Sequence, residues 1–260
     1  MLLVIDIGNT NIVLGLYRGQ DLAASWRVST DARRMPDEYA ALLHSLFALR
    51  GLSAKDVQAV AIASVVPPLI TTFQELIERF FDCHPFIVGP GVKTGVRVQF
   101  ENPKEVGADR VANALAAFRR YGGPAVVIDL GTATTLDAIS AEGDYMGGAI
   151  APGITIAAEA LFQRTARLPR VELVTPKTAI GRNTVSGMQS GIVFGYVGLI
   201  EGLVSRFVRE LGPSRVIATG GLAEVIARET PMIELVDANL TLDGIRMIYE
   251  LNRKGAESGS

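Results

Sequence analysis

The sequence predicts an α/β fold built from two similar domains. Three observations support this: strand-like and helix-like patterns alternate, one hairpin motif occurs twice, and 260 residues are enough for two cores. The first hairpin, residues 1–17, has apolar β-formers up to Ile5, the acid Asp6, and a turn at Gly8 and Asn9. A second apolar run follows the turn, so this segment is expected to form two buried strands.

The second hairpin, residues 126–136, repeats the order of apolar strand, Asp, Gly, small hydroxyl residues and apolar strand. Asp129 follows Asp6 by 123 residues, which is close to half of the chain. A repeat at that spacing indicates two similar halves rather than a solenoid. We therefore expect domains at 1–118 and 119–240, with a terminal helix at 241–252 that can pack back on the first domain.

Both hairpins carry an acid at the end of a core strand, where an apolar residue would be expected if the position served packing alone. An ionised carboxylate beside a core strand is costly unless a cation or N–H groups meet it. The turn after Asp6 is small and polar, so its N–H groups and the side chains of Asn9, Thr10 and Asn11 can approach an anion. An acid that can bind a metal, next to a turn that can bind an anion, indicates a binding site for nucleotide phosphates. Taken alone, the first hairpin could also be an ordinary hairpin with an Asp in its turn.

The other elements follow from hydrophobic periodicity and from turn and helix-start signals. The segment Gly89–Gly95 resembles a phosphate-binding loop, but Val92 precedes its Lys and a β-like run follows, which predicts a plain loop. The polar tail 255–260 is expected to fray. The remaining predicted strands are 21–28, 57–65 and 216–218, and the predicted helices are 38–49, 69–81, 111–118, 155–168, 183–210 and 241–252.

Composition narrows the function classes. The net charge of -2 gives no electrostatic sign of nucleic-acid binding. The sequence contains no run of eighteen or more uncharged apolar residues, so no membrane span is expected. Cys83 is the only cysteine, so no internal disulfide can form, and a reducing, cytoplasmic location is favoured. Because only His44 and His84 accompany it, a zinc site lacks ligands. Any cation is therefore expected to be held by oxygen.

A third acid lies before a strong helix pattern. Asp109 and Arg110 fall in the first turn of the helix predicted from Val111 onward. A helix start stabilises a carboxylate, so Asp109 is expected to be charged at pH 7, either as a reactive group or only as a partner of the helix dipole. Gly107 favours a functional role, because a ligand can reach the backbone there.

Three motifs, in this order, resemble those of type III pantothenate kinase: DIGNTN at 6–11, EVGADR at 105–110 and IDLGTATT at 128–135. Segments 147–153, 181–184 and 219–223 match glycine-rich loops of that family, and the resemblance reaches Arg253. The resemblance implies two actin-like, ribonuclease H-like domains with a nucleotide cleft between them. It places the chain in the superfamily of actin and the sugar kinases.

The family resemblance implies a reaction and a set of partners. ATP with Mg²⁺ would phosphorylate the primary hydroxyl of pantothenate to 4′-phosphopantothenate, the first step of coenzyme A biosynthesis. The resemblance also implies a monovalent cation, K⁺ or NH₄⁺, held by Asp129, while Asp6 would help to hold Mg²⁺ through the phosphates. The nucleotide would contact Asp6, Ile7, Gly8, Asn9, Thr10, Asn11 and Thr132.

The same resemblance implies the substrate site. Asp109 would be the general base, and Arg110 would hold the pantothenate carboxylate in a two-pronged contact. The family commonly has Tyr where this chain has Phe100, so stacking is kept but the phenol's hydrogen bond is lost. The implied substrate contacts are Phe100, Gly107, Ala108, Asp109, Arg110 and Thr184.

A homodimer is expected from the predicted helix 183–210. Between Gly191 and Val208 its apolar residues cover more than the roughly 100° face that one sheet needs. Either the chain itself covers the surplus or a second copy does, and the resembling family is dimeric with its pantothenate pocket by the interface.

Two other functions stay open: an actin-like kinase of another small alcohol or a sugar, and a catalytically silent nucleotide-binding regulator.

Overall fold

The computed structural model describes residues 1–165 and 167–257, and its internal contacts divide the chain into two units. The first unit contains Met1–Arg97, Glu101–Ala116 and the chain from Leu240 onward. The second unit contains Val98–Phe100 and Ala117–Asn239. The helix at residues 108–121 therefore contributes to both units.

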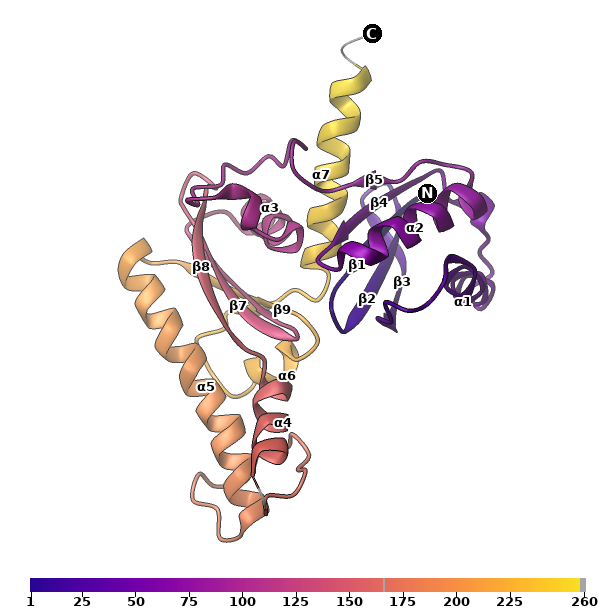
Figure 1. Ribbon diagram of the computed structural model, residues 1–260. Helices are drawn as coiled ribbons and strands as arrows, with labels where there is room; N and C mark the ends of the chain where they lie inside the picture. Colours follow the sequence, from indigo (N-terminus) through magenta and orange to yellow (C-terminus); the bar gives the residue numbers. More distant parts are fainter. Residues whose placement is uncertain (166, 258–260) are drawn as a thin grey trace. The chain divides into compact units, whose positions relative to one another are not determined.

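The first unit is built on a five-stranded sheet in the order β3-β2-β1-β4-β5. β1 runs antiparallel to β2, which is antiparallel to β3, while β1, β4 and β5 run parallel (Figure 1). The alternating and apolar runs of the sequence account for the three long strands at its centre. The strands are β1 Leu2–Ile7, β2 Asn11–Arg18, β3 Asp21–Ser29, β4 Ala59–Ser64 and β5 Phe86–Ile87.

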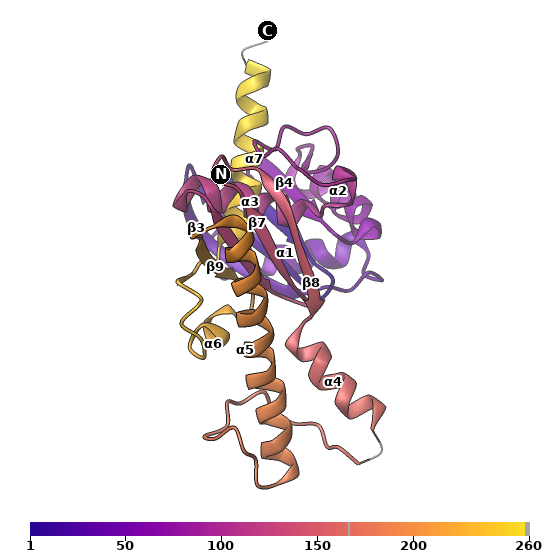
Figure 2. The same cartoon turned by 90° about the vertical axis from the view of Figure 1, so that its left-hand side faces the viewer.

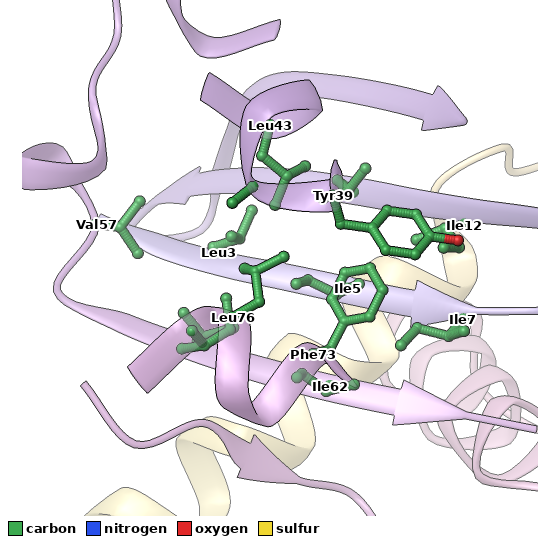
Figure 3. Packing of buried hydrophobic residues seen from close by; sticks show 14 of the residues in the cluster. Leu3, Ile5, Ile7, Ile12, Tyr39, Leu43, Val57, Ile62, Phe73 and Leu76 are labelled. Carbon is green, nitrogen blue, oxygen red and sulfur yellow. The ribbon is translucent and has the colours of Figure 1, made fainter. Parts of the chain in front are cut away.

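Helices cover both faces of this sheet. Leu3, Ile5 and Ile7 share one face because strand side chains alternate, and they pack against residues of α1 and α2 (Figure 3). Val4 faces the other way, in a cluster with residues of α3 and α7. The helices are α1 Pro36–Ala48, α2 Pro67–Phe81, α3 Ala108–Tyr121 and α7 Leu240–Glu257, with short 3₁₀ turns η1 Ala54–Asp56 and η2 Pro103–Glu105.

The second unit repeats this plan. Its sheet has the order β10-β9-β6-β7-β8, with β6, β7 and β8 antiparallel and β6, β9 and β10 parallel. Corresponding strands thus occupy corresponding places in the two sheets, which confirms the predicted α/β fold with a duplicated unit. The elements are β6 Ala125–Leu130, β7 Ala133–Ile139, β8 Tyr145–Pro152, α4 Ile154–Arg164, α5 Thr184–Leu211, β9 Arg215–Thr219, α6 Ala223–Ala227 and β10 Leu235–Val236.

Three sequence predictions need correction, and three short elements were not predicted. The expected glycine-rich loop at 147–153 is wrong, because residues 147–152 belong to β8. α4 ends at Arg164, before the predicted 168, and Ala166 lies outside the described residues. The expected fraying from Gly255 is wrong as far as residue 257, where α7 still continues, and residues 258–260 lie outside the description. β5, α6 and β10 were not predicted, because they are too short to show a period.

Much of the apolar surplus of α5 is covered within the second unit. Of the eleven bulky apolar residues between Gly191 and Val208, six are buried, and five are partly exposed: Phe194, Leu199, Leu203, Phe207 and Val208. Ile200, for example, is completely buried in the core cluster. The chain itself therefore covers much of the surplus but not all of it. α5 is also long and apolar enough to cross a membrane, but a core helix of a soluble protein passes that test too. We infer no membrane span from it.

Candidate active site

The first unit presents a polar turn at the carboxyl end of β1. Asp6 is partly buried, lies opposite Val13 of β2 and neighbours Ala63 of β4. The N–H of Gly8 donates to the carbonyl oxygen of Asn11 at 3.0 Å, which closes the turn. Asn9, Thr10 and Asn11 are exposed residues at a strand end, where open α/β sheets bind ligands.

The start of α3 lies near this turn, in the same unit. A Cβ added to Gly107 would lie 2.4 Å from Oδ1 of Asp109 and 3.6 Å from Cγ1 of Val65. The N–H of Val65 donates to the carbonyl oxygen of Ile7 at 3.0 Å, so Val65 joins the start of α3 to the end of β1. The carboxylate of Asp109 thus occupies the space that a side chain at 107 would fill. The structure brings the predicted base close to the predicted phosphate turn.

The environment of Asp109 differs from the simple helix-start expectation. Burial raises its pKa above the ordinary 3.8, and this outweighs the N–H of Arg110, which donates to Oδ1 at 2.8 Å and lowers the pKa. The charge of Arg110 also lowers it. Sequence reasoning counted the helix N–H groups but not the desolvation, which depends on tertiary packing. A raised pKa strengthens a carboxylate as a proton acceptor.

The neighbours of Asp109 have distinct surroundings. Ala108 begins α3 and packs against the apolar cluster between α3, α7 and the sheet. Arg110 follows Asp109 and is partly buried. Asn102 precedes η2, and its side chain accepts from the N–H of Lys104. This capping arranges the chain just before Gly107.

In the second unit, Asp129 ends a strand in the manner of Asp6. Gly220, at the end of β9, has φ +96°, and a Cβ there would lie 2.7 Å from Oδ1 of Asp129. A Cβ on Gly131 would lie 3.5 Å from the same oxygen. The two glycines therefore let backbone approach the carboxylate, where carbonyl oxygens could complete the coordination of a cation.

Thr132 is exposed in the turn between β6 and β7, and its carbonyl oxygen accepts from the N–H of Gly153 at 3.2 Å. A Cβ on Gly153 would lie 2.2 Å from that oxygen, so only glycine fits between the end of β8 and the start of α4. The predicted nucleotide contact Thr132 is thus braced by the start of α4.

Tyr196 is a neighbour of this hairpin that sequence reasoning missed. Its hydroxyl hydrogen-bonds with the hydroxyl of Thr134, which is completely buried. Burial raises the pKa of Tyr196, and the nearby charge of Asp129 raises it further. In the sequence, Tyr196 is a single tyrosine among apolar helix residues, and this pattern by itself predicts only a residue of the core.

Phe100 and Thr184 belong to the second unit, whereas residues 107–110 belong to the first. The ring of Phe100 lies 6.4 Å from that of Tyr145, whose hydroxyl donates to Oδ1 of Asp137 at 2.9 Å. Asp137 is completely buried. The phenol of Tyr145 is thus fixed, and it supports the half-exposed Phe100 ring.

Thr184 is the exposed first residue of α5, after the cap Asn183, whose side chain accepts from the N–H of Ser186 at 2.9 Å. Figure 2 shows this end of α5 beside the loops that follow α4, away from the strands of its sheet.

Metal ligands in the described part of the chain do not cluster. Among those residues, no group of three His, Cys, Asp or Glu side chains could hold an ion. The single carboxylates Asp6 and Asp129 still fit their predicted ions. Mg²⁺ in kinases takes one or two carboxylates together with substrate phosphates and waters, and a larger cation can use backbone oxygens.

The two Asp-bearing hairpins on duplicated sheets define an actin-like kinase fold. Solved structures with a similar fold include a putative Baf family transcriptional activator from Campylobacter jejuni, at TM-score 0.63 and 20% identity, covering 97% of this chain and 99% of that one. A putative 2-dehydro-3-deoxygalactonokinase from Sinorhizobium meliloti matches at TM-score 0.59 and 12% identity, with 96% of each chain covered. At these identities the likeness establishes the fold alone.

Sequence comparison gives the family. The family model described as type III pantothenate kinase matches residues 2–206. A type III pantothenate kinase of Roseiflexus sp. (strain RS-1) is 55% identical over 97% of this chain and 100% of its own length. One from Moorella thermoacetica is 53% identical with the same coverage. The chain belongs to the type III pantothenate kinase family.

Proposed function

We infer that this enzyme transfers the γ-phosphoryl group of ATP to the primary hydroxyl of pantothenate, forming 4′-phosphopantothenate for coenzyme A biosynthesis. The observation that carries the inference is family membership along nearly the full chain, at 52% identity or more to four relatives of that name. The first unit adds a partly buried carboxylate, Asp109, beside the end of β1.

Phosphoryl transfer depends chiefly on positioning and charge neutralisation. In our proposal Asp109 accepts the proton of the pantothenate hydroxyl as its oxygen bonds to the γ-phosphorus, and ADP leaves with the bridging oxygen. Arg110 pairs with the pantothenate carboxylate through two parallel hydrogen bonds, and Phe100 offers an apolar face. Gly107, Ala108 and Thr184 complete the substrate contacts. Asp6, Ile7, Gly8, Asn9, Thr10, Asn11 and Thr132 contact the nucleotide.

Two ions belong to the proposal. Mg²⁺ would neutralise charge on the phosphates, with Asp6 as a carboxylate on its side. A monovalent cation, K⁺ or NH₄⁺, would lie at Asp129, and the close approach of Gly220 and Gly131 to its carboxylate supports this. We also place the enzyme in the cytoplasm, which a chain with the single cysteine Cys83 favours.

A homodimer completes the proposal, although the partly exposed apolar residues of α5 are not its main support. Instead, a row of glycines runs along α5, and a Cβ added to Gly187, Gly191, Gly195 or Gly198 would meet nothing within 4 Å. Large apolar side chains are also exposed in the same unit, including Ile150 on β8 and Phe162 on α4, at 68% and 41%. A second copy packed on α5 would cover such surfaces.

The test is a coupled assay of ADP release with the purified protein, ATP, Mg²⁺ and K⁺. The acceptors are pantothenate and a panel of sugars and small alcohols, with each product identified by mass spectrometry. Phosphate on the pantothenate hydroxyl is the expected product. Turnover with a sugar instead would favour the other actin-like kinase activity, and nucleotide binding without turnover would favour a silent regulator.

A further inference from the structure

We propose that Thr30 is a positioning residue for the nucleotide-phosphate turn, and that Tyr39 fixes Thr30 to the core. The inference deepens the proposed function, because it assumes that the turn after β1 holds phosphates. All of the contacts that carry it lie within the first unit, and they form a continuous series from the buried core to residues 8–11.

Thr30 holds two peptide groups of the turn. Its hydroxyl donates to the carbonyl oxygen of Gly8 at 2.6 Å, and its N–H donates to the carbonyl oxygen of Thr10 at 2.9 Å. A trans peptide is planar, and its C=O and N–H point in opposite directions. Because both carbonyls point to Thr30, the N–H groups of Asn9 and Asn11 point away from it. Thr30 thus fixes the two peptide planes that carry these N–H donors.

Fixed N–H donors in a turn suit an anion. Backbone N–H groups of a turn can bind phosphate oxygens, and fixed donors bind better than mobile ones, since less freedom is lost on binding. Asn9 and Asn11 are exposed, so a ligand can reach them. Gly8 is needed in this arrangement, because a Cβ there would lie only 3.0 Å from the carbonyl oxygen of Asn11.

Tyr39 holds the next residue, Asp31. The phenol oxygen accepts from the N–H of Asp31 at 3.0 Å and donates to its carbonyl oxygen at 3.0 Å. Tyr39 is completely buried, with its ring 4.9 Å from that of Phe73. Figure 3 shows the ring in the core between α1 and the sheet, with its oxygen toward Ile12, at the start of β2. The rigid core therefore fixes the backbone directly after Thr30.

The experiment measures nucleotide affinity with the full chain, using a fluorescent ADP analogue with Mg²⁺. Thr30→Val keeps the shape but removes the hydroxyl, and Tyr39→Phe removes only the oxygen that holds Asp31. Thr30→Val is expected to weaken nucleotide binding about twofold to tenfold, the range that one neutral hydrogen bond supports. Tyr39→Phe loses two hydrogen bonds but acts on the turn only through Asp31 and Thr30, so it should weaken binding by a factor in the same range. The ATP KM should rise by a similar factor while the pantothenate KM stays unchanged.

Three variants control for loss of structure. Thr30→Ser keeps the hydroxyl and should restore wild-type affinity. Ser45→Ala removes a hydroxyl that donates to Ala41 on α1 at 2.9 Å, and Tyr17→Phe removes a buried phenol that donates to Asp243 at 3.0 Å. Neither of the last two should change nucleotide affinity.

The outcomes separate this inference from the proposed function. Wild-type affinity in Thr30→Val, equal losses in Thr30→Val and Thr30→Ser, or a pantothenate KM that rises together with the ATP KM would each overturn the positioning role. A wild-type protein that binds no nucleotide would overturn the proposed function itself and this inference with it.

Discussion

At the scale of single residues, the predicted base occupies a costly position. Asp109 lies in the first turn of α3 near the end of β1, and burial raises its pKa although the N–H of Arg110 donates to it. An ionised carboxylate with a raised folded pKa opposes folding at every pH above that pKa, because the folded state binds the proton more tightly. Such a cost is expected where a side chain is kept for chemistry.

Asp109→Asn tests this cost and the catalytic role together. Turnover should fall by a factor of about 10²–10⁴, the usual contribution of a general base. Nucleotide affinity should stay near wild type, and the melting temperature at pH 7 should rise, because a desolvated charge is gone. Steady-state kinetics and calorimetry measure the two effects. The matched change Asp37→Asn, at the exposed start of α1, should alter neither turnover nor affinity.

The wild-type rate should also depend on pH in a defined direction. The base works only when ionised, so kcat/KM should fall as the pH is lowered through the pKa of Asp109. Since burial raises that pKa, the fall should begin at a higher pH than the ordinary 3.8 would give. Unchanged turnover in Asp109→Asn would contradict the assignment, whatever the pH profile.

Gly107 should be intolerant of even one methyl group. In Gly107→Ala the new Cβ would lie 2.4 Å from Oδ1 of Asp109, so the carboxylate must move. A displaced base should lower kcat by roughly 10²-fold, as misplacement of about 1 Å can. Gly89→Ala is the control, because a Cβ there meets nothing within 4 Å. Equal rates in the two variants would show that the position of Asp109 does not matter.

At the scale of elements, the ends of β6 and β9 form the second polar site. Asp129 is partly buried, and Gly220 brings the backbone of the β9–α6 loop against its carboxylate. Sequence reasoning found both segments as separate motifs. Parallel pairing of β6 with β9, in which Asp129 pairs with Thr219, brings them together.

A monovalent cation at this site should be visible in the salt dependence of the rate. Replacing Na⁺ by K⁺ or NH₄⁺ at constant ionic strength should increase turnover, since the larger ions suit a site built from one carboxylate and backbone oxygens. Asp129→Ala should abolish the difference between the salts. Glu234→Ala, an exposed acid before β10, should keep it. Equal wild-type rates in both salts would argue against the site.

At the scale of the whole molecule, the proposed dimer needs a test that spares the fold. Ile200, in the apolar middle of α5, is completely buried, so a charge there would unfold the second unit rather than test the interface. Gly195 is better suited, because a side chain at this position enters open space and replaces a poor helix former.

Light scattering of the wild type at micromolar concentration should give twice the chain mass of 27.7 kDa. Gly195→Arg should halve that mass while the melting temperature at high dilution stays equal or rises. Glu210→Arg, exposed in the last turn of α5, should remain dimeric. If the proposed pocket lies by the interface, Gly195→Arg should also lose activity. A fully active wild-type monomer would refute both the dimer and the shared pocket.

The sequence by itself determined the repeat and most of the elements. Strand alternation, the paired Asp-Gly hairpins and the long helical patterns are local signals, so the strands β1, β2, β6 and β7 and the helix α3 could be predicted from the printed letters. The candidate acids Asp6, Asp109 and Asp129 followed from the cost of a charge beside a core strand or from a helix start.

Only the tertiary structure decided what surrounds those acids. Desolvation raised the pKa of Asp109 against the helix-start expectation, because burial depends on residues distant in sequence. Much of the apolar surplus of α5 packs within its own unit, since a helical pattern does not reveal how many elements cover it. The contacts around the two turns also join residues that are separated along the chain. Thr30 and Gly8 are 22 residues apart, Tyr39 and Asp31 are 8 apart, and Tyr196 and Thr134 are 62 apart. No local pattern encodes such contacts.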